Sequence, residues 1–326
     1  MHGPDGFLNA ATAVATGAIS AGTIGASIRQ ARTTLTDKQI PLAGLAAAFI
    51  FAAQMFNFPV AAGTTGHLLG GTLAAILLGP SVGAIVVTIV VIVQAVAFAD
   101  GGLTALGYNV LNMAIVTAFG GWAAYRLFRK IFPNSGAGVV AATGLAGGLS
   151  VVLSAAAFSV EWLFGATAPV PFDTVFGAMV GAHLLIGVGE GVISGMAVGA
   201  VLAARPDLVY GARDLDRSQL ANRKALSTRT FLISGFGVVL LLAVIVSQFT
   251  ADGLDGLERV AADTGITATT QESMPSIFAD YATEGIGNES LSLAVAGASG
   301  AIITLLVGAG LFSAVRLQKP RDKAMV

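Results

Sequence analysis

The chain contains no cysteine, and only 11 % of its residues are charged. The absence of cysteine excludes disulfides, iron–sulfur clusters and thiolate metal sites, so any metal must be bound by nitrogen or oxygen. Soluble domains carry about a quarter charged residues, whereas this chain is 55 % hydrophobic with a mean hydropathy of +0.82. Its formal net charge of −1 argues against nucleic acid as a partner. We therefore predict a helical protein embedded in the lipid bilayer.

Two catalytic signatures are also missing. No glycine is followed by lysine, so the chain has no P-loop for ATP. The H-E-x-x-H pattern of zinc metalloproteases does not occur either. These absences leave ATP-hydrolysing and metalloprotease functions without support. The start of the chain lacks a basic region ahead of its first apolar run, so we expect no cleavable signal peptide.

The apolar runs predict an all-α integral membrane protein with nine spans in total, as seven spans followed by two more. The 42 glycines suit membrane helices that pack closely through small residues. We expect a membrane domain at 1–204, a charged cytoplasmic linker at 205–229, and a two-span module at 230–318 whose loop covers 250–290. The predicted spans are 7–28, 40–58, 67–79, 82–98, 104–125, 137–162, 174–204, 230–249 and 291–315.

The basic residues predict the orientation. All but one of the 17 lysines and arginines lie in 29–38, 126–130, 205–229 or the tail from Arg316 onward. Because cytoplasmic loops are enriched in these residues, we expect the N-terminus outside the cell membrane and the C-terminus in the cytoplasm. The loop at 250–290 then lies outside, and its acidic side chains would concentrate cations there. A merely solvated loop is the alternative.

The first two residues, Met1 and His2, offer three nitrogens in a row: the α-amine, the amide of residue 2 and the imidazole. Bound to one ion, they close a five-membered and a six-membered ring, and a planar nitrogen set suits Ni(II) or Cu(II). His67 lies on the same predicted face and could supply a fourth nitrogen. The alternatives are a frayed terminus for His2 and an interfacial hydrogen bond for His67.

Other polar residues lie at predicted membrane depth, where they are costly. His183 and Glu190 are seven residues apart on one helix face, and they could orient the ligands, form a transit site for the metal, or join helices. Three amide side chains could orient an imidazole or connect helices. These are Gln94, Asn109 and Asn112. Two outer carboxylates, Asp5 and Asp100, could hold the N-terminal segment in place.

Several of these motifs, taken in order, resemble a known family. They are Met1-His2 with Pro4-Asp5-Gly6-Phe7-Leu8, Gly66-His67-Leu68-Leu69-Gly70-Gly71, Leu78-Gly79-Pro80, Asp100-Gly101-Gly102 running into Asn109 and Asn112, and His183 to Glu190. Over about 1–204 the chain closely resembles the substrate-binding component of cobalt/nickel energy-coupling-factor transporters, the CbiM/NikM type. Gly3 replaces a residue that is usually bulky and aliphatic, so we expect a looser N-terminal loop.

The remainder, about 228–318, resembles the small two-span accessory subunit of the same transporters. Its signature is Asp255-Gly256-Leu257-Glu258, with Leu254 where a proline is usual, followed by Val260-Ala261 and Asp280-Tyr281.

The resemblance implies a seven-helix core that captures Ni(II) or Co(II) from outside through the Met1 amine, the His2 amide and imidazole, and His67. It also implies three partners, namely a transmembrane coupling subunit and two cytoplasmic ATPases. We therefore predict a metal-uptake subunit without catalytic activity or a prosthetic group. The alternatives are a stand-alone secondary transporter or channel, and an intramembrane metalloenzyme that uses His183 and Glu190.

Overall fold

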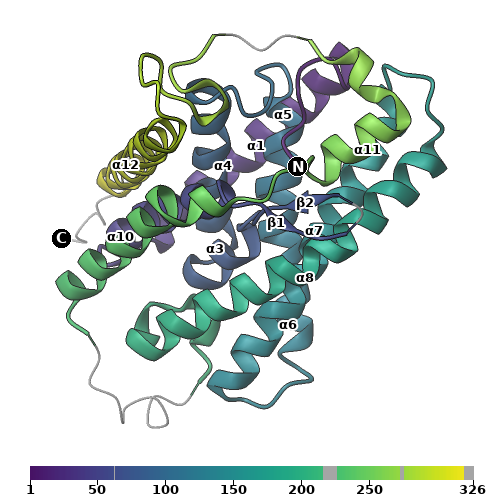
Figure 1. Cartoon of the computed structure of the whole chain (residues 1–326). Helices are drawn as coiled ribbons and strands as arrows, with labels where there is room; N and C mark the ends of the chain where they lie inside the picture. The colour runs from purple at the N-terminus through teal and green to yellow at the C-terminus, as the bar shows by residue number, and fades with distance from the viewer. Residues whose placement is uncertain (62, 216–225, 272–274, 319–326) are drawn as a thin grey trace.

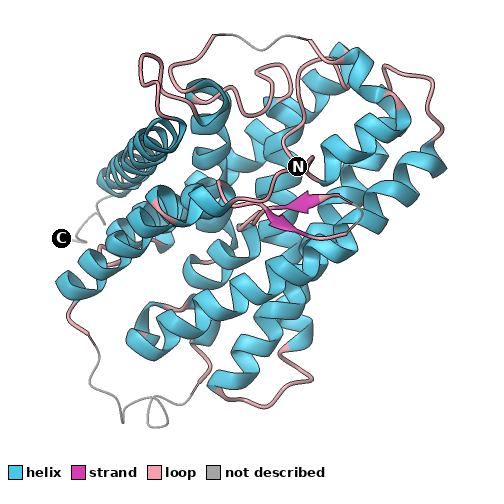
Figure 2. Cartoon of the chain, viewed as in Figure 1, coloured by secondary structure: helices cyan, strands magenta, loops and turns pink. Residues whose placement is uncertain are grey.

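The computed structural model of the chain describes residues 1–61, 63–215, 226–271 and 275–318 (Figure 1). Helices make up most of it, with one short pair of strands (Figure 2). Parts of the expected linker, 216–225, and of the expected outer loop, 272–274, lie outside the described residues. So does the basic tail from residue 319 onward.

The first two thirds of the chain form a helical bundle. Its elements are α1 (Ala10–Thr34), α2 (Gln39–Gln54), β1 (Phe58–Pro59), β2 (Thr65–Gly66), α3 (Gly71–Leu78), α4 (Pro80–Ala97), α5 (Leu106–Asn109), the π-helical segment η1 (Val110–Gly120), α6 (Gly121–Phe128), α7 (Gly136–Gly165) and α8 (Phe172–Ala204). The remaining elements are η2 (Pro206–Leu208), η3 (Tyr210–Ala212), α10 (Thr228–Val244), η4 (Val246–Phe249), α11 (Gly256–Thr264), η5 (Ile266–Thr269), η6 (Ala279–Tyr281) and α12 (Glu289–Leu317).

Side-chain caps fix where the long helices begin. The side chains of Asn9, Ser135, Ser227 and Asn288 each accept a hydrogen bond from a backbone N–H in the first turn of α1, α7, α10 and α12. Pro80 opens α4, at a position where its missing N–H costs no helical hydrogen bond. Each predicted span boundary at these helices is therefore set by local chemistry as well as by hydropathy.

Within the described residues, six helices are long and apolar enough to cross a membrane: α1, α4, α7, α8, α10 with η4, and α12. A seventh apolar helix, α2, is shorter. The predicted fifth span, 104–125, corresponds to α5, η1 and α6, which follow one another without a break. The mostly helical membrane protein predicted from composition is thus observed. The count of nine spans and the seven-helix core remain predictions.

The predicted third span, 67–79, differs from the structure. Only Gly71–Leu78 is helical, which is eight residues and too short to cross a bilayer. Residues 67–70 before it are in neither a helix nor a strand. They follow β2, which pairs antiparallel with β1, and Gly70 then turns the chain into α3 at φ +80°. Hydropathy does not distinguish residues 67–70 from part of a span, because all four are buried although they are not helical.

The two C-terminal spans pack on the bundle. Helices α10 and α12 both contact α2 and each other on one side of the molecule (Figure 1). The approach is close at Gly44 and Gly308, since a Cβ built on Gly308 would lie 3.1 Å from the Gly44 Cα. Small residues at such contacts let helix backbones pack tightly in a membrane. The C-terminal module therefore forms one packed body with the first domain.

The described start of the expected linker, 205–215, also lies against the bundle. Leu208 and Val209 are buried, and the Tyr125 hydroxyl donates a 2.6 Å hydrogen bond to the Gly211 carbonyl oxygen. This stretch packs across one end of the helices. The domain boundary at 204/205 remains a prediction from charge.

Candidate metal centre

The N-terminal segment is threaded into the bundle and held there by Asp5. Its carboxylate accepts hydrogen bonds from the Thr104 amide at 2.7 Å and the Thr104 hydroxyl at 2.5 Å. The amides of Leu103 and Ala105 donate two longer ones at 3.2 Å. Because these amides begin the turn that leads into α5, the negative charge sits at a helix start, where it is favoured. Asp5 thus fixes the position of the two residues ahead of it.

Asn109 binds the same segment on both sides. Its side-chain oxygen accepts from the Gly3 amide at 2.8 Å, and its side-chain nitrogen donates to the Gly3 carbonyl at 2.9 Å. The space beside Gly3 is filled, since a Cβ built there would lie 2.4 Å from a ring carbon of Tyr108. The expectation that Gly3 loosens the loop is therefore wrong, because the Tyr108 ring occupies the volume of the missing side chain.

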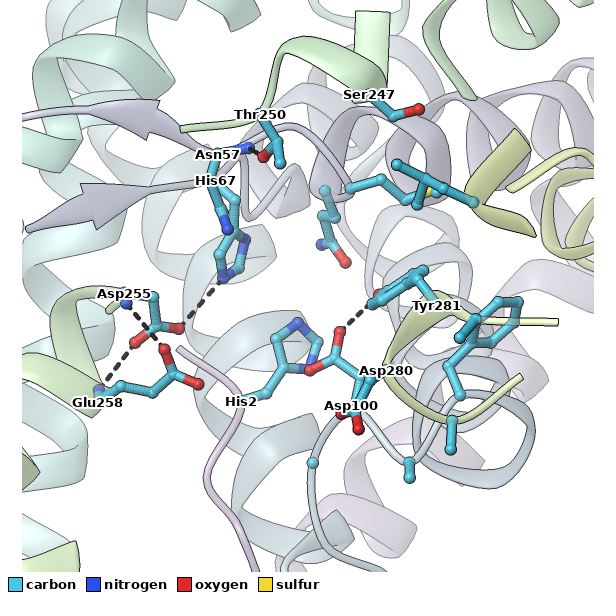
Figure 3. Close-up of a pocket in the computed structure, with 18 of the residues that line it drawn as sticks. His2, Asn57, His67, Asp100, Ser247, Thr250, Asp255, Glu258, Asp280 and Tyr281 are labelled. Carbon is cyan, nitrogen blue, oxygen red and sulfur yellow. Dashed lines mark hydrogen bonds and ion pairs between the residues drawn. The ribbon is translucent and has the colours of Figure 1, made fainter. Parts of the chain in front are cut away.

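This threading brings the candidate nitrogens together. The Met1 α-amine lies 3.0 Å from the His67 Nε2 atom. The His2 and His67 ring centroids are 5.3 Å apart, and both rings face the same cleft (Figure 3). Two nitrogens that bind one ion at about 2.05 Å and at a right angle lie about 2.9 Å apart. The spacing of Met1 and His67 matches that of neighbouring ligands on one metal ion.

The tautomer of His67 suits a ligand. Its Nδ1 atom lies 3.0 Å from the Leu68 carbonyl oxygen, which can only accept, so Nδ1 carries the proton and Nε2 keeps its lone pair. The loop that carries His67 is anchored by Glu190 on α8. The two carboxylate oxygens of Glu190 accept from the Leu69 amide at 2.6 Å and the Gly70 amide at 3.0 Å. Glu190 thus holds the backbone beside His67 without approaching the nitrogens themselves.

His2 presents a free nitrogen. Its Nδ1 atom, which would close the six-membered chelate ring, is buried and has no hydrogen-bond partner among the described residues. The Oδ1 atom of Asp100 lies 3.6 Å from it. Burial lowers the pKa of the His2 imidazole to about 4 despite the neighbouring Asp100. At neutral pH the ring is therefore uncharged and available as a ligand.

Asp100 is held in place by the C-terminal module. The Tyr281 hydroxyl donates a 2.5 Å hydrogen bond to Asp100 Oδ2 (Figure 3). Gln94 donates to the same hydroxyl at 3.1 Å. Burial, together with the adjacent carboxylate, raises the pKa of Tyr281 well above its usual value, so it stays a donor. The Tyr281 ring packs 4.9 Å from that of Phe98. Gln94, Tyr281 and Asp100 thus form a chain that ends beside the imidazole of His2.

A second residue of the module reaches the other side of the site. Asp255, at the start of α11, forms an ion pair through its Oδ2 atom with the Met1 amine. The same oxygen lies 3.6 Å from His67 Nε2. Burial alone would raise the pKa of the Asp255 carboxyl, but the positive amine and the His67 ring hold it well below its usual value. The sequence identified Asp255 as part of a motif and did not predict this contact.

A cleft of about 1380 Å³ opens onto the site and is lined by His2 and His67 together with residues of the C-terminal module. We call it the acidic vestibule, because its described lining contains no lysine or arginine and has seven carboxylates. These are Asp100, Asp252, Asp255, Glu258, Asp280, Glu284 and Glu289. Six of the acidic residues expected in the outer loop therefore face this cleft. Asp263 instead pairs with Arg259 at 3.7 Å, and Glu272 lies outside the described residues.

Of the two remaining candidates, Asn112 is placed away from the site and His183 beside it. Asn112 donates a 2.8 Å hydrogen bond to Glu161 on α7, a buried contact between helices. Glu161 was missed by the sequence analysis, although an acidic residue inside an apolar span was the available signal. His183 bonds through Nδ1 to the Met179 carbonyl at 2.7 Å. It lines a small cavity of about 10 Å³ together with Met1, His67 and Asp255, so it lies beside the candidate nitrogens.

Side chains alone do not make a metal site here. Over the residues that the structure describes, no three His, Cys, Asp or Glu side chains are grouped so that they could hold an ion. The Met1-His2 chelate would add an amine and a main-chain nitrogen to the side chains at this point.

Residues 2–208 match the family model for the cobalt uptake substrate-specific transmembrane region, and 229–317 match the PDGLE domain. The chain belongs to the cobalt uptake substrate-specific transmembrane family. Its C-terminal module is the accessory domain that the sequence suggested.

Relatives and solved structures agree with this assignment. A protein of Haloquadratum walsbyi, provisionally named as a metal transport protein, is 42 % identical over 64 % of this chain and 94 % of its own. The fused nickel transport protein of Rhodobacter capsulatus is 31 % identical over 97 % of this chain and 98 % of its own. The crystal structure of a truncated transition metal transporter aligns with a TM-score of 0.56 and 33 % identity, covering 62 % of this chain and 98 % of that one.

Proposed function

We propose that this chain captures Co(II) or Ni(II) outside the cell membrane, as the substrate-binding subunit of an energy-coupling-factor transporter. The ligands are the Met1 amine, the His2 amide and Nδ1 atoms, and His67 Nε2. The observation that carries the proposal is the 3.0 Å approach of the Met1 amine to His67 Nε2, two groups that are 66 residues apart in sequence. The metal is the cargo of this site, which performs no catalysis.

The surroundings support capture of a cation. The acidic vestibule leads to His2 and His67, and a cleft lined by one sign of charge raises the local concentration of the opposite ion. The match to a cobalt uptake family and the likeness to a nickel transport protein indicate the same ions. Because amide coordination displaces a proton, affinity should fall as the pH is lowered.

Energy for transport comes, in this proposal, from partner subunits. The sequence lacks a P-loop, so ATP hydrolysis is assigned to two cytoplasmic ATPases that act through a transmembrane coupling subunit. Uptake by cells that contain this chain alone should therefore be lost. Uptake that persists without the ATPases would favour a stand-alone transporter or channel.

The deciding experiment is calorimetric titration of Ni(II) and Co(II) into purified protein whose N-terminus is a free Met1. The matched variant carries one alanine inserted between Met1 and His2. The insertion keeps every side chain but enlarges the chelate ring between amine and imidazole, so we expect one tightly bound ion in the native protein and none in the variant.

Equal binding by the two proteins would place the site elsewhere and would refute the N-terminal chelate. An alanine inserted in the exposed turn at 134/135 serves as the control for insertion as such, and it should leave binding unchanged.

A further inference from the structure

We propose that Asp255 supplies an oxygen ligand to the ion held by Met1, His2 and His67. In this way the C-terminal module would take part in the metal site and set its preference between ions. The inference rests on the proposed function, because it assumes the nitrogen chelate. It adds a fifth ligand that comes from a different module of the chain.

The carboxyl group of Asp255 is oriented by its own helix. Its Oδ1 atom accepts from the Glu258 amide at 2.9 Å, while the Asp255 amide donates to the Glu258 side chain, also at 2.9 Å. This reciprocal capping box uses one carboxylate oxygen. The other oxygen, Oδ2, is left to face the Met1 amine and His67.

The position of Oδ2 suits a ligand above a plane of nitrogens. An oxygen at about 2.1 Å from the ion, perpendicular to metal–nitrogen bonds of about 2.05 Å, lies about 3 Å from each nitrogen. Oδ2 already contacts the Met1 nitrogen and lies 3.6 Å from His67 Nε2. A shift of about 0.6 Å away from the Met1 nitrogen and toward His67 Nε2 brings it near that spacing.

The remaining motif residues hold Asp255 against the bundle. A Cβ built on Gly256 would lie 2.8 Å from a ring carbon of His183 and 2.7 Å from Ile186, so only glycine allows this approach to α8. Leu257 is buried, with 2 % of its surface exposed. Asp255 is therefore held in one position against α8, unlike the exposed acidic residues of the 250–290 loop.

Charge balance favours a carboxylate at this point. A divalent ion bound through a deprotonated amide retains one positive charge, and the Met1, His2 and His67 side chains around it are almost completely buried. An uncompensated buried charge is costly. One carboxylate bound to the ion cancels it.

The fifth ligand has a consequence for selectivity. Four planar nitrogens suit Ni(II) and Cu(II). An oxygen above the plane moves the site away from that geometry and so favours Co(II) relative to a strictly planar site. Asp255 thereby allows a chelate whose planar nitrogens suit Ni(II) to bind Co(II) as well.

The test compares the native protein with Asp255→Asn. Asparagine is as good a helix cap as aspartate, and when its oxygen caps Glu258 its NH₂ group faces the ion and cannot bind it. The control is Asp252→Asn, which removes the same charge from the vestibule wall at an exposed residue. Binding of Ni(II) and Co(II) is measured by calorimetry, and the magnetic susceptibility of the Ni(II) form is recorded.

We expect paramagnetic Ni(II) in the native protein and in Asp252→Asn, and diamagnetic, planar Ni(II) in Asp255→Asn. The Co(II) affinity should fall at least about tenfold more than the Ni(II) affinity in Asp255→Asn only. Diamagnetic Ni(II) in the native protein, or an unchanged ratio of the two affinities, would overturn the assignment. The magnetic measurement on the native Ni(II) protein needs no variant, so the proposal can be tested even if Asp255→Asn misfolds. Absence of binding to the native protein would instead refute the chelate itself.

Discussion

Replacement of Asp5 by alanine tests whether the site depends on docking of the N-terminal segment. Asp5 touches none of the candidate nitrogens, but its two shortest hydrogen bonds, both to Thr104, hold the segment that carries them. Hydrogen bonds to a charged group contribute about 1.5–3 kcal/mol each. Their loss removes about 3 kcal/mol from the docked state, and the metal must replace this free energy when it binds. We therefore expect Ni(II) affinity to fall by about 100-fold or more, at about 1.4 kcal/mol per factor of ten.

The assay is calorimetric titration of the native protein, Asp5→Ala and Asp5→Asn. The stoichiometry and the spectrum of the bound ion should not change, because every ligand is still present. Asp5→Asn keeps an acceptor oxygen for Thr104 and should lie between the other two. The exposed Asp173 provides a charge-matched control, Asp173→Ala. An Asp5→Ala protein that binds as tightly as the native one would refute the role of docking, and so would a changed spectrum.

Three further predictions concern groups around the nitrogens. Tyr281→Phe keeps the ring but loses the bond to Asp100, so metal affinity measured by calorimetry should fall about tenfold. Glu190→Gln leaves one oxygen for two amides, so the loop of His67 should lose about 1.5–3 kcal/mol and the midpoint of thermal unfolding should fall. Burial lowers the His2 pKa from 6.5 to about 4. As the pH falls, His2 therefore takes up a proton in the unfolded state before it does so in the folded state. Stability present above pH 6.5 should therefore fall by about 3 kcal/mol toward pH 4, and thermal unfolding of His2→Asn should lack this part of the pH dependence.

Hydropathy and capping residues predict the long helices well, because each needs only local information. The predicted sixth and seventh spans, 137–162 and 174–204, match α7 and α8 to within three residues. The third span was predicted too long because residues 67–70, which are buried but not helical, lie in the same apolar run as the helix that follows them. Glycine conformation at Gly70 decides where that helix begins, and composition does not report it.

Only part of the candidate site could be proposed from the sequence, for a similar reason. Met1, His2 and His67 could be proposed because the chemistry of three adjacent nitrogens is visible in the sequence. The contacts from Asp255 and Tyr281 could not, since they join residues about 180 to 250 positions apart through packing of the C-terminal module. Asn112 was grouped with Asn109 by helical spacing, yet the two diverge, one to Glu161 and the other to Gly3. Spacing identifies a shared face but not the partner.

The ion pair between residue 1 and residue 255 bears on how the protein is made. The N-terminal segment leaves the ribosome first, but a contact across this length of chain can form only after nearly all of it has been synthesised and inserted. Closing such long loops is the slow part of folding. The contacts through which Asp5 and Asn109 hold the segment can form earlier, whereas the ion pair at Met1 must wait for α11, and a chain truncated before α11 would present its amine and imidazole without the carboxylate that meets them. The set of contacts around Met1 is therefore complete only when nearly the whole polypeptide has been synthesised.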